Sequence, residues 1–419
     1  MALTLLYAVL LAFVPYLVAV GRAPKLDWRR TRWWIVALAL AARAGMLALP
    51  VPFGDDLYRY WWEGRVQLAG ENPYRHAPEA GELAGLRDAN WERVGHKEVP
   101  SAYPPVLLGV FHVGARLGRS PDVFRWIFTA FDLAIGWLLV RLLRASGQNE
   151  SLSLIWLLNP LVILEFAGNG HEMSLPICMF VAGLWLLAGT SCTETCTAKH
   201  HVAAGIAFAS AVLAHVMAWP VILSVIAAER MRSWRFWLAF AGILALCSWP
   251  AMDAGNDALL GLTNVAGRWR FNGSLFEVLV RFLGHEDPRR GFGGVWVVYE
   301  LPKRIAAAVF LAVLGWTTVR RYGSARAALT VTGALLLLSP TVHPWYVTWV
   351  VALVCVEFSV AWLAFSGFVI VSYVARVVEL ETGVWVDAGF VRWMEYAPLL
   401  LLLAAEWWWK PIDTRRARQ

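Results

Sequence analysis

The sequence predicts an all-α, polytopic bundle of transmembrane helices, and three observations support that fold class. Of 419 residues, 59% are hydrophobic and only 16% are charged, whereas a soluble domain carries roughly 25% charged residues. The mean hydropathy is +0.54. Many of the 25 tryptophans stand at the ends of apolar runs, as in Trp33-Trp34 and Trp407-Trp408-Trp409, and an indole with one polar edge suits a membrane–water interface.

The apolar runs set the expected number of crossings. A spanning helix needs roughly 20 apolar residues, and the runs predict about 11 to 13 spans. The range reflects 202–214 and 216–228, which are short and form either two helices or one broken hairpin. We therefore expect one integral-membrane domain over 1–419. In chain order the candidate spans are 3–21, 33–51, 125–143, 152–168, 174–190, 202–214, 216–228, 235–251, 304–320, 327–341, 345–357, 359–376 and 392–409.

Charge in the short loops predicts the orientation. The net charge is +7, but the basic residues cluster between apolar runs, so topology and anionic lipid headgroups explain them better than nucleic acid does. The positive-inside rule assigns these clusters to the cytoplasm. The loop 52–124 and the segment 252–302 are then non-cytoplasmic. The basic clusters are Arg22–Arg32, Arg141–Arg144, Glu229–Arg235, Arg320–Arg326 and Arg415–Arg418.

One apolar stretch in the first outer loop, Tyr103–Gly118, tests this orientation. It holds only about 16 residues, fewer than a span needs, and it begins Tyr103-Pro104-Pro105. If it crossed, the charge pattern would invert for the rest of the chain. We therefore expect an interfacial or re-entrant helix on the outer face.

The first outer loop opens with an acidic pair, Asp55 and Asp56. A helix through Leu57–Arg65 would place Asp56, Tyr60 and Glu63 on one face, and Asp55 and Arg59 at salt-bridge spacing. Acidic residues also suit a helix N-terminus without any further role. The surrounding Tyr, Trp and Arg favour a cleft for a sugar and a phosphate.

A carboxylate at this position has two possible chemical roles. It would either accept a proton from an acceptor hydroxyl as a general base, or hold a divalent cation that neutralises a leaving phosphate. The residues leave both open. Ionisable groups inside spans add further candidates, because such groups are functional or paired with one another. They are Arg43, Asp132, Glu165, His215 and Glu357.

A series of segments in the first outer loop and beyond resembles the bacterial integral-membrane glycosyltransferases of the GT-C class that use polyprenyl-phosphate sugars. It is most similar to their mannosyltransferase-like, glycosyltransferase 87-type group. The matching segments are Asp55-Asp56-Leu57-Tyr58-Arg59-Tyr60, Trp62-Glu63-Gly64-Arg65, Gly70-Glu71-Asn72-Pro73-Tyr74, Ala77-Pro78-Glu79, Tyr103-Pro104-Pro105, Asn159-Pro160-Leu161, Glu165, Gly170-His171, Trp269-Arg270-Phe271-Asn272 and His343-Pro344-Trp345-Tyr346.

The resemblance implies transfer of a hexose, with mannose as the expected sugar, from a polyprenyl-phosphate donor to a glycan or glycolipid acceptor. It implies inversion and an active site on the periplasmic or exterior face of a bacterial inner membrane. Asp55 or Asp56 would be the catalytic base. The implied substrate-binding residues are Arg59, Tyr60, Glu63, Arg65, Tyr103, Glu165, His171, Arg270, Asn272, His343 and Tyr346.

Three departures from the pattern bear on the donor contacts and the sugar. Relatives usually have Asp where Glu63 stands. They often have Asn-Asp after the Gly-His pair, where this chain has Glu172-Met173, and often Lys where it has His215.

Two other classes also fit parts of the sequence. A transporter or lipid flippase would explain many helices and buried charges but not the long outer loop, and transporters often show matched interrupted helices in two halves. A membrane ligase or phosphotransferase acting on an intact lipid is the second alternative.

Overall fold

The computed structural model describes residues 2–189, 194–283, 300–386 and 389–409. Within these ranges the chain is helical, and strand-like pairing is limited to isolated bridges between Phe271 or Asn272 and Thr341. The α-helices are α1 Ala2–Arg22, α2 Trp28–Leu47, α3 Asp56–Leu68, α4 Pro105–Leu117, α5 Val123–Ala145, α6 Leu154–Leu157, α7 Pro160–Ile163, α8 Ser174–Ala188, α9 Glu194–Val212, α10 Ala218–Glu229, α11 Trp234–Asp253, α12 Leu260–Arg268, α13 Leu275–Phe282, α14 Glu300–Val319, α15 Ser324–Leu338, α16 Thr348–Val354, α17 Val360–Phe368, α18 Tyr373–Thr382 and α19 Gly389–Trp409.

The predicted all-α, polytopic membrane fold is confirmed. Among the described residues, four helical segments are long and apolar enough to cross a membrane, and a bent pair adds a fifth. Shorter apolar helices, including α8, α10 and α15, pack around them. The total of about 11 to 13 crossings stays a prediction. The four segments are Ala2–Lys25, Val123–Ala145, Glu300–Val319 and Val360–Thr382.

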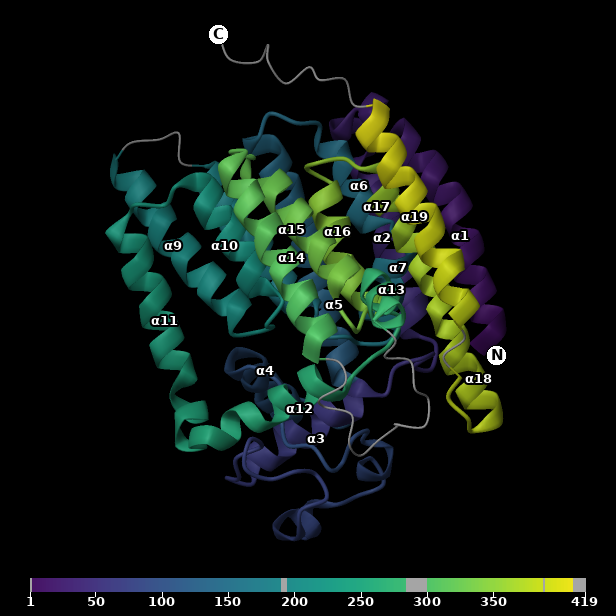
Figure 1. The fold of residues 1–419 in the computed structure, drawn as a ribbon, viewed down its shortest axis with the longest axis vertical. Coiled ribbons are helices and arrows are strands. Elements are labelled where there is room, and N and C mark those ends of the chain that lie inside the picture. Colours follow the sequence, from purple (N-terminus) through teal and green to yellow (C-terminus); the bar gives the residue numbers. More distant parts are fainter. Residues whose placement is uncertain (1, 190–193, 284–299, 387–388, 410–419) are drawn as a thin grey trace.

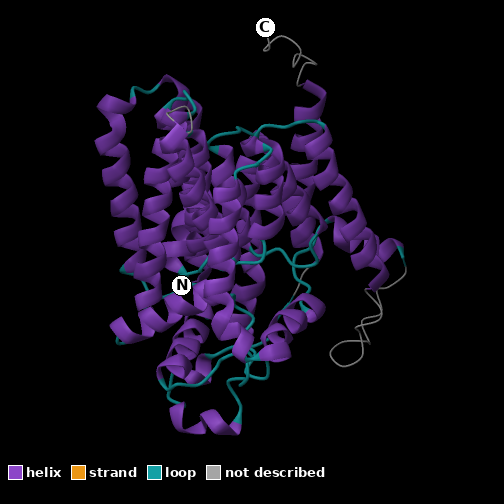
Figure 2. Ribbon diagram, turned by 90° about the vertical axis from the view of Figure 1, so that its left-hand side faces the viewer, coloured by secondary structure: helices purple, strands orange, loops and turns teal. Residues whose placement is uncertain are grey.

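The two ends of the bundle differ (Figure 1). The long helices run along the vertical of the view, and the turn from α1 to α2 lies at the upper end. Helices α3, α4 and α12 lie at the lower end with the loops that join them. Figure 2, a quarter turn away, shows the same separation of long helices above and loop-rich chain below. The outer loop predicted at 52–124 thus forms a cap over one end of the bundle.

This cap has its own apolar core. Leu57, Tyr60 and Trp62 of α3 pack with Leu107 and Phe111 of α4. The helices approach closely because α3 has Gly64, where a β-carbon would lie 2.3 Å from the carbonyl oxygen of Phe111. At 13 residues, α4 is too short to span a bilayer, and the interfacial or re-entrant placement of Tyr103–Gly118 stays a prediction.

The predicted span 152–168 is broken, and its sequence explains why. Its two halves meet at a bend of 53° at Asn159-Pro160. A residue before proline favours extended backbone, and Asn159 has ψ 122°. Its side chain caps the second half by accepting hydrogen bonds from the amides of Leu161 and Val162, and proline suits the first helical position. The second half ends in a π-helical turn, η5, Leu164–Gly168.

Candidate active site

The acidic pair is held where the chain leaves α2 and starts α3. The amide of Phe53 donates to Asn169 Oδ1 at 3.1 Å, and the Phe53 ring stacks on Tyr373 with ring centroids 4.6 Å apart. A β-carbon at Gly54 would lie 3.0 Å from the Asn169 carbonyl oxygen. The pair is therefore anchored to the turn after η5 and to α18.

Asp55 is paired with a permanent cation. Arg376 of α18 donates from Nη2 to Asp55 Oδ2 at 2.9 Å and from Nε to the Phe53 carbonyl oxygen at 3.1 Å. Its Nη1 contacts Glu379. The pairing of Asp55 with Arg59 that the four-residue spacing suggested is not formed. Asp55 is the residue before the helix, with φ −127°, so helical spacing does not apply to it.

Asp56 faces a histidine instead. His171 Nε2 lies 3.5 Å from Asp56 Oδ2, and His171 Nδ1 lies 2.7 Å from Glu165 Oε2. His171 and Glu165 are buried, whereas 34% of the Asp56 side chain is exposed. The three side chains form a row in which His171 lies between Glu165 and Asp56. Asp56 is its outer carboxylate and is partly exposed to solvent.

Backbone geometry explains how His171 reaches this place. The π-helical turn η5 widens the helix end, and the His171 amide donates back to the Glu165 carbonyl at 2.9 Å. Gly170 has φ +73°, and a β-carbon there would lie 3.0 Å from Arg125 Cγ, so glycine suits this position on both counts. Single π turns inside helices occur frequently at functional sites.

Further groups fix the inner carboxylate. The Tyr373 hydroxyl donates to Glu165, with Oε2 2.9 Å away. Asn169 donates to the same carboxylate at 3.3 Å. The His171 ring lies on the Trp345 ring, with centroids 3.8 Å apart and planes at 25°. The imidazole is thus held by an acid on one edge and an indole on one face.

The surroundings raise the pKa of both Asp56 and His171. Burial raises the pKa of the Asp56 carboxyl to about 7, and Asp55 and Glu172 add to the rise while His171 and Arg376 oppose it. Burial alone would lower the pKa of His171, but its hydrogen bond to Glu165 and the nearby charges of Glu165, Asp56 and Glu172 raise it. The histidine and the outer carboxylate therefore both bind a proton more readily than they would in water.

Glu172 and Tyr60 add a second link between the loop and the bundle. The Tyr60 hydroxyl donates to Glu172 Oε2, and the Tyr60 ring stacks on Phe111 with centroids 4.5 Å apart. Tyr103 packs edge-on against both Tyr60 and Phe111. Tyr60 and Tyr103 are therefore part of the wall next to Asp56.

Arg59, Glu63 and Arg65, three of the predicted substrate-binding residues, lie on α3 and contact other parts of the cap. Arg59 binds Glu63 Oε1 at 2.6 Å and donates to the carbonyl oxygens of His96 and Val99. Glu63 also accepts from the Ser101 hydroxyl at 2.7 Å. Arg65 pairs with Asp88 at 2.5 Å. These side chains hold the loop against α3.

Arg270 and Asn272 lie in the second outer segment and contact neighbouring helices. Arg270 pairs with Glu277 of α13. Asn272 is buried with φ +52°, and its amide donates to Glu395 of α19 at 2.7 Å. The Tyr396 hydroxyl donates to the Asn272 carbonyl at 2.8 Å.

His343 and Tyr346 lie beside Trp345, next to the Asp56 centre. The His343 ring stacks on Trp345 with centroids 4.2 Å apart and planes at 4°, and Tyr346 contacts it edge-on at 5.4 Å. Burial lowers the pKa of His343 to about 3, so this ring is neutral at pH 7. The permanent positive charge near Asp56 is that of Arg376, and His171 is the nearby histidine whose pKa is raised.

Spacing in the sequence indicated the row Asp56–His171–Glu165 only in part, and it missed Glu172, Trp345, Tyr373 and Arg376. Arg376 and Glu379 lie at the end of an apolar run. That position was the one feature of the sequence that pointed to them as candidate site residues. Within the described ranges, no three His, Cys, Asp or Glu side chains converge as metal ligands would.

Comparison with known proteins gives the family. Residues 1–232 match the model of the MptA_B family, described as alpha-(1->6)-mannopyranosyltransferase, N-terminal domain. This part of the chain contains Asp55, Asp56, Glu165, His171 and Glu172. No solved structure matches.

Two curated relatives carry related names. Alpha-(1->6)-mannopyranosyltransferase B of Corynebacterium glutamicum is 26% identical over 73% of this chain and 56% of its own length. A probable alpha-(1->6)-mannopyranosyltransferase of Mycolicibacterium smegmatis is 24% identical over 55% of this chain and 39% of its own. The chain thus spans about half the length of the first and less of the second. Since the family model covers more than half of its residues, the chain belongs to the MptA_B family.

Proposed function

We propose that this protein transfers mannose from polyprenyl-phosphate-mannose to a hydroxyl of a glycan or glycolipid acceptor, with Asp56 as general base. The transfer takes place at the non-cytoplasmic membrane face, under the cap formed by the loop 52–124. The observation that carries the proposal is the row Asp56–His171–Glu165, which ends in a partly exposed carboxylate with a pKa of about 7. Family membership supports mannose as the sugar.

The two aspartates differ in a way that favours Asp56 as the base. Asp55 is held by Arg376 at 2.9 Å, and a carboxylate that accepts a charge-assisted hydrogen bond from arginine is a poor proton acceptor. Among the described residues, the ion-pair contact of Asp56 is the 3.5 Å approach of the titratable His171. A general base is most effective when its pKa lies near the working pH, and Asp56 meets that condition.

The proposed step is a single displacement at the anomeric carbon. The acceptor oxygen bonds to that carbon while its proton passes to Asp56. The bond from the anomeric carbon to the phosphate oxygen breaks, and its electron pair leaves with the lipid phosphate. Attack from the face opposite the phosphate inverts the anomeric centre. The donor stays anchored in the bilayer, which requires a site at the membrane surface.

His171 and Arg376 are the proposed positive groups beside this centre. Charge that develops on a departing phosphate is stabilised by preorganised cations, and both side chains lie near Asp56. His343 has a different proposed role. Its buried Nε2 has no hydrogen-bond partner among the described residues, and a neutral imidazole suits a sugar hydroxyl. Tyr60, Tyr103 and Tyr346 would line the sugar subsite.

Purified Asp56→Asn and Asp55→Asn variants test the base assignment with radiolabelled polyprenyl-phosphate-mannose and membrane acceptors. Asp56→Asn should lose about 10²- to 10⁴-fold in kcat/KM, the usual contribution of a general base, and Asp55→Asn about tenfold or less. Glu82→Gln, which alters an exposed acid in the same loop, is the matched control and should retain activity. Full transfer by Asp56→Asn would refute the assignment.

Two further measurements test the donor and the membrane face. Polyprenyl-phosphate-glucose and GDP-mannose, offered in place of the proposed donor, should give little product; efficient use of GDP-mannose would contradict a lipid-linked donor. A reporter fused after Arg418 should give a cytoplasmic signal, and a periplasmic signal would invert the proposed orientation.

A further inference from the structure

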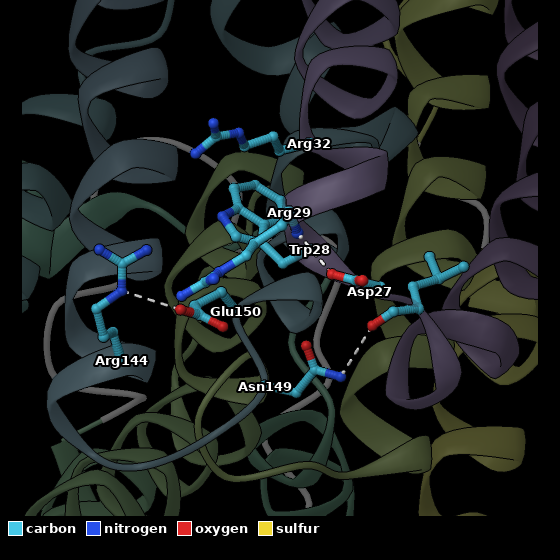
Figure 3. Close-up of a pocket in the computed structure, with 8 residues that line it drawn as sticks. Asp27, Trp28, Arg29, Arg32, Arg144, Asn149 and Glu150 are labelled. Carbon is cyan, nitrogen blue, oxygen red and sulfur yellow. Dashed lines mark hydrogen bonds and ion pairs between the residues drawn. The ribbon is translucent and has the colours of Figure 1, made fainter.

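A charged cavity lies at the end of the bundle opposite the Asp56 centre. It has a volume of about 850 Å³, within the roughly 300–1,000 Å³ range of small-molecule sites. It is formed where the turn from α1 to α2 meets the turn after α5, and Arg29, Arg32 and Arg144 line it together with Trp28 and Asn149 (Figure 3). None of these residues belongs to the proposed active site, so this cavity needs its own explanation.

The cavity has an excess of positive charge. Its two acids, Asp27 and Glu150, are already engaged. Asp27 caps α2 by accepting from the Arg29 amide at 2.9 Å and contacts Arg30 at 3.4 Å. Glu150 accepts from Arg144 at 2.9 Å. For the guanidinium groups of Arg29 and Arg32, no carboxylate lies within 4.0 Å among the residues described.

The arginines surround the hollow from different elements. In Figure 3, Arg32 and Arg29 extend from α2, and Arg144 extends toward them from α5. Asn149 fixes the floor by donating to the carbonyl oxygens of Pro24 and Leu26, at 3.1 and 3.4 Å. Arg29 and Arg32 thus line the cavity from one helix and Arg144 from another, and guanidinium groups suit a phosphate, which they bind through paired N–H donors.

The rim of the cavity continues onto apolar surface. Trp33 and Trp34 follow Arg32 directly on α2 and are 69% and 80% exposed. Exposed tryptophans beside arginines are typical of the interface between headgroups and acyl chains. A ligand with its phosphate in the cavity would therefore have room for acyl chains along α2. This favours a lipid over a free phosphate.

We propose that this cavity binds the phosphate headgroup of an anionic phospholipid, with Arg29 and Arg32 as its main contacts. The bound lipid would join the turn between α1 and α2 to the turn after α5. The charge pattern of the loops predicts this end to be cytoplasmic, the leaflet where anionic lipids attract juxtamembrane arginines. The proposal is independent of the transferase assignment.

The test uses the purified full chain in zwitterionic detergent micelles. Phosphatidylglycerol, phosphatidylcholine, glycerol 3-phosphate and inorganic phosphate are titrated separately, with lipid retention followed by native mass spectrometry and stability by the melting temperature. Phosphatidylglycerol should be retained and should raise the melting temperature, and the other three should not. If inorganic phosphate or glycerol 3-phosphate binds as tightly, the cavity is a free-phosphate site and the lipid proposal fails.

Two double variants separate the cavity from general surface charge. Arg29→Gln/Arg32→Gln should weaken phosphatidylglycerol binding by about 30-fold, because each arginine near a headgroup contributes roughly fivefold. Arg235→Gln/Arg320→Gln removes two exposed arginines, one at the start of α11 and one just after α14, on the same predicted face, and should stay within about twofold of wild type. Equal losses in both would overturn the proposal.

Folding is checked independently of lipid binding. Both double variants should melt at the wild-type temperature in lipid-free micelles, since Arg29 and Arg32 are exposed. Arg32→Lys keeps the charge but loses the paired N–H donors, so it should bind phosphatidylglycerol more weakly than the wild type and more tightly than Arg29→Gln/Arg32→Gln. If Arg29→Gln/Arg32→Gln binds phosphatidylglycerol as the wild type does, the cavity is excluded as the site.

Discussion

Two carboxylates in the interior of this protein have opposite surroundings. The Asp132 carboxylate of α5 accepts hydrogen bonds from Arg43 Nε at 2.5 Å and Nη2 at 2.9 Å, and from the Trp156 indole at 2.9 Å. Arg43 also donates to the Leu157 carbonyl at 2.8 Å. Both side chains are at most 2% exposed. This ion pair is complete without any further ligand.

Asp56 has one contact with a titratable group and remains partly open to solvent. The difference shows how its surroundings determine what a carboxylate can do. A buried carboxylate that is satisfied by a permanent cation fixes the helices it joins. A carboxylate beside histidine, with spare hydrogen-bonding capacity and a pKa of about 7, can exchange a proton with a substrate.

The largest expected effect on folding comes from breaking the buried ion pair between Arg43 and Asp132. Asp132→Asn leaves Arg43 buried without a counter-charge, and removal of one partner from a buried ion pair costs about 3–5 kcal/mol. The melting temperature and the yield of monodisperse protein in detergent should both fall sharply. The double variant Arg43→Met/Asp132→Leu removes both charges and should recover most of the loss. Wild-type stability in Asp132→Asn would show that the pair is dispensable.

The next largest effect is expected from His171, the histidine beside Asp56, on the pH dependence of activity. Wild-type kcat/KM should rise with pH through about 7, because protonated Asp56 cannot accept a proton. His171→Gln removes a group that lowers the Asp56 pKa, so the rise should move to higher pH. At pH 7 the loss should be roughly 10- to 100-fold, and part of it should be recovered near pH 9.

Glu165→Gln is the companion variant for His171. It weakens the 2.7 Å contact that raises the His171 pKa while leaving the imidazole in place. It should therefore shift the pH profile in the same direction by a smaller amount. A loss that is the same at every pH in both variants would show that His171 only positions its neighbours.

The sequence predicted the parts of this picture that depend on local pattern. The apolar runs correspond to helices of nearly the same bounds, as for 174–190 and α8 or 304–320 and α14. Periodicity and length are properties of short segments, so a single sequence reveals them.

The contacts that complete the site were beyond such patterns. Arg376 is 321 residues from Asp55, and Glu172 is 112 residues from Tyr60, and no spacing rule reaches across such distances. Arg59 has a carboxylate four residues away on each side, Asp55 and Glu63, and the expected pairing with Asp55 was wrong. Arg59 pairs with Glu63 because both residues lie inside α3, whereas Asp55 precedes the helix and has non-helical backbone.

The smallest predicted effect is also the sharpest contrast with Asp132. The folded-state pKa of Asp56 is raised to about 7, above its unfolded value near 3.9. Folding therefore favours the protonated form, so the stability of the fold falls as the pH rises from the unfolded pKa near 3.9 to the folded pKa of about 7, and it stays constant above that. At pH 8, Asp56→Asn removes this cost and should stabilise the protein by roughly 1–2 kcal/mol, discounted because a third of the side chain meets solvent.

Near pH 4 the wild type and Asp56→Asn should melt at similar temperatures, because the carboxyl is then protonated in the folded state. Melting curves at both pH values measure the difference. The same Asp-to-Asn change is thus expected to destabilise the protein at position 132 and to stabilise it at position 56. An Asp56→Asn variant that melts below the wild type at pH 8 would mean that the ionised carboxylate holds the cap in place, and the separation between a structural and a chemical carboxylate would fail.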